Sequence, residues 1–279
     1  MAPSNRITLG LIGVGDHGTN VDLKGFLHQK DAQIVATCDV DTTLIDRSKK
    51  LVGGTYSERY GVSNYKGIYT SQDWRELVAR DDIDAICVAT PDHWHVLCAL
   101  GGLRAGKDVF CEKPLSLTIN EGRVLADESK RLDKISMTGS ENRSKSNFLK
   151  ICELVRNGRI GKLQHTHVEL PGGRWVRDMG IGLSQETQPI PAHFDFNMWQ
   201  GPVAHRDYSP GLLHFNWRWL TSYSGGFITD WGAHMLDIAQ WGNGTDLTGP
   251  VSVKGTGTFQ EDGYYDTATA WNLDYEYAN

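Results

Sequence analysis

The sequence predicts an α/β protein of two domains: an N-terminal doubly wound parallel sheet, then a C-terminal α/β domain with a mostly antiparallel, open sheet. Three observations support this fold class. The 279 residues are enough for two ordinary domains. Short β-branched runs alternate with helical segments up to about residue 139. After about residue 162, strand-like runs surround a long segment rich in glycine, proline and aromatic residues.

The strand candidates of the first domain are short apolar runs separated by helical patterns. They are ITLGLIG (7–13), AQIVATCD (32–39), IDAICVAT (83–90), DVFCEKP (108–114) and KISMTG (134–139). Amphipathic segments such as WRELVAR and NEGRVLADESKRL lie between most of them. This alternation predicts βαβ units and therefore a parallel sheet.

The second domain begins with a predicted helix over 145–157, in the run SNFLKICELVRN, which Gly158 closes. Its strand candidates are KLQHTHVEL (162–170), GPVSVKGTGTF (249–259) and TATAWNLDYEY (267–277). We therefore expect domains at 1–141 and 142–279. Because the chain stops directly after a strand-like run, we expect the second domain to be C-terminally incomplete.

Composition and charge indicate a small-molecule partner. The net charge is −6 without a basic tract, which argues against nucleic acid and anionic lipid. No apolar run is long enough for a membrane helix, and the N-terminus has no signal-peptide pattern, so we expect a cytoplasmic protein with no membrane contact. The five cysteines form no CxxC pair and are expected to be buried free thiols.

The first strand runs into a glycine motif, G-x-G-x-x-G, formed by Gly13, Gly15 and Gly18. Between a strand and a helix, this motif permits a tight turn and lets a pyrophosphate approach the backbone, as in Rossmann domains. Asp39 ends the second strand, where a carboxylate accepts hydrogen bonds from the adenosine ribose. No cation follows before Arg47, which favours NAD over NADP. The alternative is a surface turn followed by an incidental acid.

Two further motifs follow the fourth and fifth strands: Thr90-Pro91-Asp92-His93-Trp94-His95 and Glu112-Lys113-Pro114. Ligands bind at the carboxyl ends of strands in open α/β sheets. Pro114 constrains the turn, a cis bond being one way, and directs Lys113 toward the crevice. The alternatives are a helix N-cap at Asp92 with surface histidines, and an exposed lysine. No metal is expected, because His93 and His95 are two residues apart.

The segment TDWGAHMLDIAQW (229–241) is predicted to be a two-faced helix. Asp230, His234 and Asp237 share one narrow face, while the apolar residues lie on another. A solvated face, a metal site and a catalytic site are all compatible with this spacing.

Six motifs in order resemble one known family. GVGDHG, CDVD, ATPDHWH, CEKPL, CELVRNGRIGKL and GGFITDWGAHMLDI are similar to the glucose-fructose oxidoreductase and inositol dehydrogenase (Gfo/Idh/MocA) family, from about residue 5 to the end. The resemblance implies a Rossmann domain, a second α/β domain, a tightly held nicotinamide cofactor and a homodimer or homotetramer. Many relatives carry a twin-arginine export signal, so it also implies a periplasmic location if such a signal has been removed.

The resemblance also implies roles for single residues. It places Lys113 beside the nicotinamide, with Asp230 and His234 facing it across the substrate. It implies that Glu112 meets the nicotinamide ribose and that Asn142 lines the cofactor site. With the glycine motif, the expected cofactor-binding residues are Gly13, Gly15, Asp16, His17, Gly18, Asp39, Thr90, Asp92, His93, Trp94, His95, Glu112, Lys113 and Asn142.

These roles predict oxidation of a carbohydrate alcohol by NAD. His234 would take the hydroxyl proton, Asp230 would fix its tautomer, and Lys113 would stabilise the alkoxide. Substrate hydroxyls would be held by Arg218, Tyr223 and Asp237, each of which is alternatively structural. A second hypothesis is a glycosidase that uses NAD transiently. The resemblance implies that one such group lacks the E-K-P lysine, so Lys113 favours a dehydrogenase. A third is a non-catalytic cofactor-binding fragment.

Overall fold

The computed structural model describes residues 5–170, 184–260 and 263–278. The chain packs as two compact units, one formed by Met1–Gly139 with Glu186–His214 and the other by Ser140–Gln185 with Phe215–Asn279. Residues 186–214 therefore pack with the first unit, although they lie well beyond the domain boundary expected after residue 141. Among the described helices, none combines the length and apolarity that crossing a bilayer requires.

The first unit is built on a six-stranded parallel sheet, which confirms the predicted doubly wound fold. The strand order is β3-β2-β1-β4-β5-β6, so the order in which strands are added reverses between β1 and β4, where such sheets bind ligands. The strands are β1 (Ile7–Ile12), β2 (Ala32–Cys38), β3 (Tyr69–Ser71), β4 (Ala85–Val88), β5 (Asp108–Cys111) and β6 (Ser136–Thr138). The sequence did not predict β3, which has three half-buried residues and therefore no alternation to detect.

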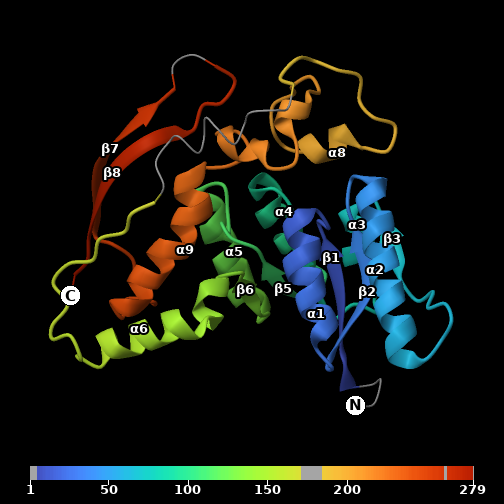
Figure 1. Ribbon diagram of the computed structural model, residues 1–279, viewed down its shortest axis with the longest axis horizontal. Helices are drawn as coiled ribbons and strands as arrows, with labels where there is room; N and C mark the ends of the chain where they lie inside the picture. The colour runs from blue at the N-terminus through green and yellow to red at the C-terminus, as the bar shows by residue number, and fades with distance from the viewer. Residues whose placement is uncertain (1–4, 171–183, 261–262, 279) are drawn as a thin grey trace. The chain divides into compact units, whose positions relative to one another are not determined.

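Helices cover both faces of this sheet (Figure 1). They are η2 (Gly18–Leu23), α1 (Lys24–His28), α2 (Thr42–Tyr60), α3 (Trp74–Val78), α4 (Asp92–Arg104) and α5 (Ile119–Leu132). One apolar cluster includes Leu23, Ile34 and Val52, and another includes Ile86 and Leu103. Burial of each such side chain stabilises the fold by about 1.5–3 kcal/mol. The two clusters therefore stabilise the sheet that carries the loops at its carboxyl edge.

A segment distant in sequence completes the first unit. It contains α8 (Phe196–Gln200) and η4 (Pro210–Leu212). We call residues 193–201 the strap. The amide of Thr42 donates to the His193 carbonyl and the amide of Asp195 donates to the Val40 carbonyl, both at 2.9 Å. The strap therefore pairs with the loop that follows β2.

The other end of the strap is tied to α4. Its Trp199 carbonyl accepts hydrogen bonds from His93 Nε2 and Trp94 Nε1, both at 3.0 Å. Gly201 has a φ of +55°, and a Cβ there would meet the indole of Trp94. The strap thus joins the loop after β2 to the start of α4.

The second unit contains two packed helices and a small antiparallel sheet. Its elements are η3 (Glu141–Ser144), α6 (Ser146–Arg156), η5 (Asn216–Trp219), α9 (Phe227–Gly242), β7 (Ser252–Phe259) and β8 (Ala268–Glu276). The helix predicted over 145–157 is confirmed as α6, and Gly158 follows it with a φ of +68°. The strands predicted over 249–259 and 267–277 are confirmed as an antiparallel pair.

One predicted strand of this unit is wrong. The run KLQHTHVEL (162–170) adopts no strand. A strand exists only where a neighbour accepts and donates its backbone hydrogen bonds. In the described part of this unit, β7 and β8 pair with each other, and residues 163–169 instead line a cleft with α6 and α9. Alternating sequence alone does not supply a pairing partner.

Candidate functional site

The glycine loop at the end of β1 has the close backbone approaches that its three glycines predict. Gly13 has a φ of +87°, and a Cβ there would lie 2.6 Å from the Ala89 carbonyl oxygen. A Cβ on Gly18 would meet the Gly13 carbonyl, whereas the Cβ position of Gly15 is open. The backbone at Gly15 is therefore accessible to a ligand.

The amides of this loop divide into two groups. The amide of Gly13 donates to the Cys38 carbonyl at 2.9 Å, and that of Val14 donates to Asp39 Oδ2 at 2.8 Å. Within the described part of the chain, the amides of Gly15, Asp16 and His17 have no hydrogen-bond acceptor. Unpaired amides at the start of a helix bind anions. The loop thus fits a pyrophosphate.

Asp39 lies behind the loop at the end of β2. Besides the amide of Val14, its carboxylate accepts the amide of Asp41 at 3.1 Å. Burial raises the pKa of Asp39 to about 6, against those hydrogen bonds, which lower the pKa. The carboxyl group of Asp39 is therefore more easily protonated than that of an ordinary aspartate.

The contacts of Arg47 with this loop were not predicted from the sequence. Its Nη2 atom donates to the carbonyls of Val14 and Gly15, both at 2.9 Å, and to Thr19 Oγ1 at 3.2 Å. Sequence spacing treated Arg47 as remote from the site. Arg47 lies in the second turn of α2, which Asp41 caps, but its sequence position alone does not show that it faces the loop.

Glu112 and Lys113 follow β5. His17 Nε2 lies 3.4 Å from Glu112 Oε1, and this carboxylate raises the pKa of His17. Three potential metal-ligand atoms, one each from His17, Asp22 and Glu112, lie within 4.8 Å of one another. Lys113 is half-buried, and its peptide bond to Pro114 is cis.

The loop after β4 does not have the surface histidines of the alternative interpretation. His93 and His95 are 2% and 1% exposed, and Pro91, rather than Asp92, occupies the cap position. His95 faces two carbonyl oxygens, Pro114 at 2.7 Å from Nδ1 and Thr90 at 2.8 Å from Nε2. Both bonds form together only when both ring nitrogens carry protons. His95 thus joins the two loops that carry the predicted cofactor contacts.

In the second unit, helix α9 places Asp230 and His234 one turn apart. Asp230 is buried, and its Oδ2 lies 3.4 Å from Arg218 Nε. Arg218 packs against the rings of Phe215 and Trp217, each 4.3 Å from its guanidinium carbon. His234 is half-buried. Arg218 thus interacts with the carboxylate predicted to orient the base.

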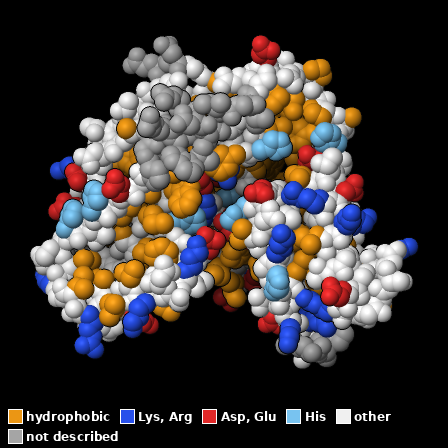
Figure 2. Space-filling view, viewed as in Figure 1, with side chains coloured by type: hydrophobic (Ala, Val, Ile, Leu, Met, Phe, Trp, Pro, Cys, Tyr) orange, Lys and Arg blue, Asp and Glu red, His pale blue; other side chains and the backbone are white. Residues whose placement is uncertain are grey.

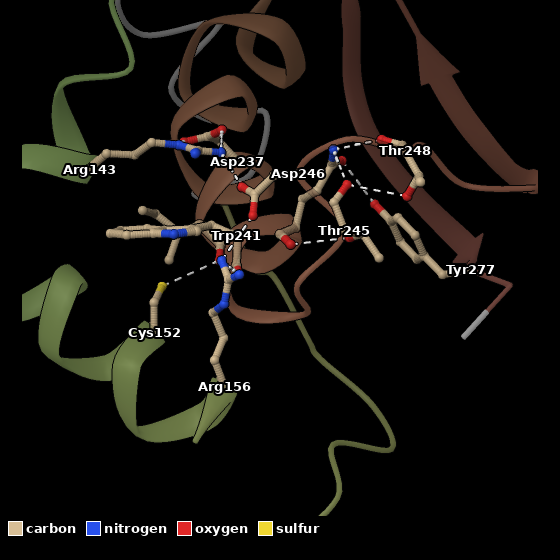
Figure 3. Close-up of polar contacts among 11 residues, drawn as sticks. Arg143, Cys152, Arg156, Asp237, Trp241, Thr245, Asp246, Thr248 and Tyr277 are labelled. Carbon is tan, nitrogen blue, oxygen red and sulfur yellow. Dashed lines mark hydrogen bonds and ion pairs between the residues drawn. The ribbon is translucent and has the colours of Figure 1, made fainter. Parts of the chain in front are cut away.

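The other substrate-binding candidates lie in different surroundings. Tyr223 is fully buried. Asp237 forms a two-pronged ion pair with the guanidinium of Arg143, at 2.8 and 2.7 Å (Figure 3). Arg143 also pairs with Asp246 at 3.0 Å, and Arg156 pairs with the same acid at 2.9 Å. The carboxylate of Asp237 therefore has a strong partner within its own unit.

The predicted site residues are divided between the two units. Lys113 and the glycine loop belong to the first, whereas Asn142, Asp230 and His234 belong to the second. Asn142 is buried, and its Oδ1 accepts from Lys145 Nζ at 2.8 Å. That Lys113 and His234 converge on one substrate stays a prediction.

A cleft of about 520 Å³ lies elsewhere in the second unit, between α6, α9 and residues 163–169. Apolar side chains are visible over these helices (Figure 2). The side chains that line the cleft include Ile151, Met235 and Ile238 but none of the predicted catalytic side chains.

Comparison with known families accounts for both units. The oxidoreductase family with an NAD-binding Rossmann fold matches residues 7–140, and the C-terminal alpha/beta domain of the same family matches residues 145–279. The chain belongs to the Gfo/Idh/MocA oxidoreductase family. The resemblance inferred from the six motifs is therefore confirmed.

Curated Gfo/Idh/MocA-like relatives include glycosidases. A glycosyl hydrolase family 109 protein of Shewanella pealeana is 33% identical over 161 residues, covering 58% of this chain and 34% of the relative. An alpha-N-acetylgalactosaminidase of Shewanella oneidensis is 30% identical over 168 residues, covering 59% and 35%. The matched region spans about a third of the length of these relatives.

Solved structures share the Gfo/Idh/MocA fold. The WlbA dehydrogenase of Chromobacterium violaceum, in complex with NADH and UDP-GlcNAcA, has a TM-score of 0.68 at 16% identity, covering 98% of this chain and 64% of that one. GenD2 from gentamicin A biosynthesis, in complex with NAD, has a TM-score of 0.65 at 18% identity, covering 98% and 63%. At these identities the likeness concerns the fold alone.

Proposed function

We propose that the protein is an NAD-dependent oxidoreductase that transfers hydride between nicotinamide and a secondary hydroxyl of a sugar, glycoside or polyol. One observation carries the proposal. The glycine loop at the switch point of the sheet exposes three amides beside Asp39, which suits a dinucleotide. The relatives named as glycosidases, among them an alpha-N-acetylgalactosaminidase, support a carbohydrate substrate.

The residues present fit NAD better than NADP. The amides of Gly15, Asp16 and His17 would hold the pyrophosphate, and Asp39 would accept the hydroxyls of the adenosine ribose. The carboxylates of Asp39 and Asp41 would repel a 2′-phosphate. When bound, NAD supplies the hydride acceptor.

The chain's own groups would manage the substrate proton. The Nδ1 atom of His234 is buried, so Nε2 would take the proton from the hydroxyl. Asp230, one turn earlier, would stabilise the imidazolium. The ammonium of Lys113 would stabilise the developing alkoxide. An alcohol is a weak acid, so a base and a cation are both required.

A second candidate function is a glycosidase that uses NAD without net oxidation. The observation in its favour is the similarity to a glycosyl hydrolase family 109 protein and to an alpha-N-acetylgalactosaminidase. Lys113 favours the dehydrogenase over this function, since the resemblance implies that one group of such glycosidases usually lacks this lysine.

One assay set separates the two functions. The purified protein is incubated with NAD and a panel of sugars, polyols and aryl glycosides. Accumulation of NADH supports the dehydrogenase. Release of the aglycone without NADH supports the glycosidase. Binding of NAD with neither product would leave a cofactor-binding protein and contradict both catalytic proposals.

We further propose that the protein assembles as a homodimer or homotetramer. The second unit exposes large apolar side chains on and beside β7, including Val251, Val253 and Phe259, and exposed apolar patches mark interaction surfaces. Sedimentation equilibrium should give a mass of two or four chains. A monomer at all concentrations tested would contradict this proposal.

A further inference from the structure

The strongest unassigned feature is the single guanidinium nitrogen of Arg47, which contacts three acceptors of one loop. The acceptors are the carbonyls of Val14 and Gly15 and the hydroxyl of Thr19. Thr19 Oγ1 in turn donates to the Val14 carbonyl at 2.6 Å. Hydrogen bonds that involve a charged group are stronger than neutral ones. These contacts therefore hold two consecutive peptide groups of the loop.

Because the peptide bond is planar, these contacts also determine the direction in which the neighbouring amides point. In a trans peptide, the carbonyl of one residue and the amide N–H of the next point in opposite directions. Because the carbonyls of Val14 and Gly15 point toward Arg47, the amides of Gly15 and Asp16 point away from it. These are amides without an acceptor in the described part of the chain.

The opposite side of the Val14 residue is fixed as well. Its amide donates to Asp39 Oδ2 at 2.8 Å, while its carbonyl accepts from Arg47 and Thr19. Glycine loops pay a large conformational entropy when they order. Because contacts on both sides of Val14 order the loop without a ligand, part of this conformational entropy is lost before a ligand binds.

We propose that Arg47 is a positioning residue for the dinucleotide: it preorganises the glycine loop so that the free amides face the pyrophosphate. The inference rests on the proposed function, since it requires that a dinucleotide binds. A cation near Asp39 could instead bind a 2′-phosphate directly, and the two roles make different predictions. A positioning residue acts on NAD and NADP alike, whereas a phosphate ligand acts on NADP alone.

The test compares Arg47→Met with Lys50→Met, an exposed residue on the same helix. Dissociation constants for NAD and NADP are measured by calorimetry, and unfolding temperatures are measured without cofactor. Arg47→Met should weaken the binding of both dinucleotides by the same factor, about tenfold, as expected for loss of charge-assisted hydrogen bonds. Lys50→Met should change neither affinity.

The conservative variant Arg47→Lys separates positioning from general destabilisation. Its ammonium carries three donors, so it should recover part of the lost affinity. Without cofactor, Arg47→Met should have the same unfolding temperature as Lys50→Met.

Three results would overturn the inference: wild-type NAD affinity in Arg47→Met, a loss confined to NADP, or no recovery in Arg47→Lys together with a lowered unfolding temperature. If the wild-type protein binds neither dinucleotide, the proposed function fails and this inference fails with it. If the wild-type protein binds NAD and Arg47→Met binds equally well, only this inference fails.

Discussion

At the residue scale, Asp39 is a half-buried carboxylate that would accept the hydroxyls of the adenosine ribose. Its pKa, raised to about 6 by burial, means that the carboxylate is charged at pH 7 and protonated at pH 5. Only the charged form accepts two ribose hydroxyls fully. The dissociation constant for NAD should therefore rise as pH falls through about 6.

The variant Asp39→Asn provides the control for this pH dependence. It should bind NAD more weakly at pH 7, and its affinity should change less between pH 7 and pH 5. Calorimetry across that range measures both proteins. Wild-type affinity that is unchanged or tighter at pH 5 would contradict the assignment.

His93 makes a separate prediction about stability. Burial lowers its pKa to about 4 from an ordinary value of 6.5, so the folded state binds fewer protons than the unfolded state between these values. The free energy of unfolding should therefore fall on acidification from pH 6.5 to 4, by about 3 kcal/mol at about 1.4 kcal/mol per pKa unit. Asp39 has the opposite sign, since its raised pKa favours the folded state on acidification.

Urea denaturation of the wild type and His93→Gln separates these effects. Glutamine keeps a donor for the Trp199 carbonyl but does not titrate. As the pH falls from 6.5 to 4, the free energy of unfolding of the wild type should fall relative to that of His93→Gln. A constant difference would show that His93 does not titrate in this way.

The proposed base is tested by His234→Ala. Turnover should fall to the background level, because the variant lacks the proposed base, while NAD affinity should stay within about twofold of the wild type. Steady-state assays and calorimetry measure the two quantities. Comparable activity in the variant would eliminate His234 as the base.

At the element scale, the ion pair between Asp237 and Arg143 joins α9 to η3. Asp237→Asn should lower the free energy of unfolding by about 1 kcal/mol, a typical value for a partly exposed pair. It should leave the KM for the substrate unchanged if the role of Asp237 is structural. Arg143→Met should destabilise the protein similarly. A raised KM with unchanged stability would instead support Asp237 as a substrate ligand.

The elements also show what the sequence predicts. The β-branched runs and the helix around Asp230 and His234 were predictable because burial on one or both faces imposes a period on the sequence. The run 162–170 has a strand pattern, but its pairing depends on distant residues. The strap contacts the loop after β2 through backbone groups, which leave no side-chain pattern.

The candidate site, too, was predictable from the sequence only in part. The glycine loop and Asp39 were predictable because their chemistry resides in residue type and spacing. Arg47 was missed, since its contacts depend on the direction of α2 relative to β1. The ion pair of Asp237 was missed because Arg143 is remote in sequence.

At the scale of the whole molecule, bound NAD should protect residues that are far apart in sequence. Ligand at 100 times its dissociation constant stabilises the binding state by about 2.7 kcal/mol. Because the strap belongs to the first unit, slower hydrogen exchange should appear both in residues 5–139 and in 193–201. Mass spectrometry of deuterated peptides measures this. Protection confined to residues 5–139 would contradict a coupling between the strap and the cofactor site.

The position of the strap in the sequence also affects how the protein is made. On a ribosome, the six strands emerge long before residues 193–201, and translation proceeds at about 5–20 residues per second. Until then, His93 and Trp94 lack the Trp199 carbonyl that accepts their hydrogen bonds. The dinucleotide unit is therefore finished only after part of the following unit has been synthesised, and a nascent chain released near residue 141 would leave these side chains exposed to solvent and to other nascent chains.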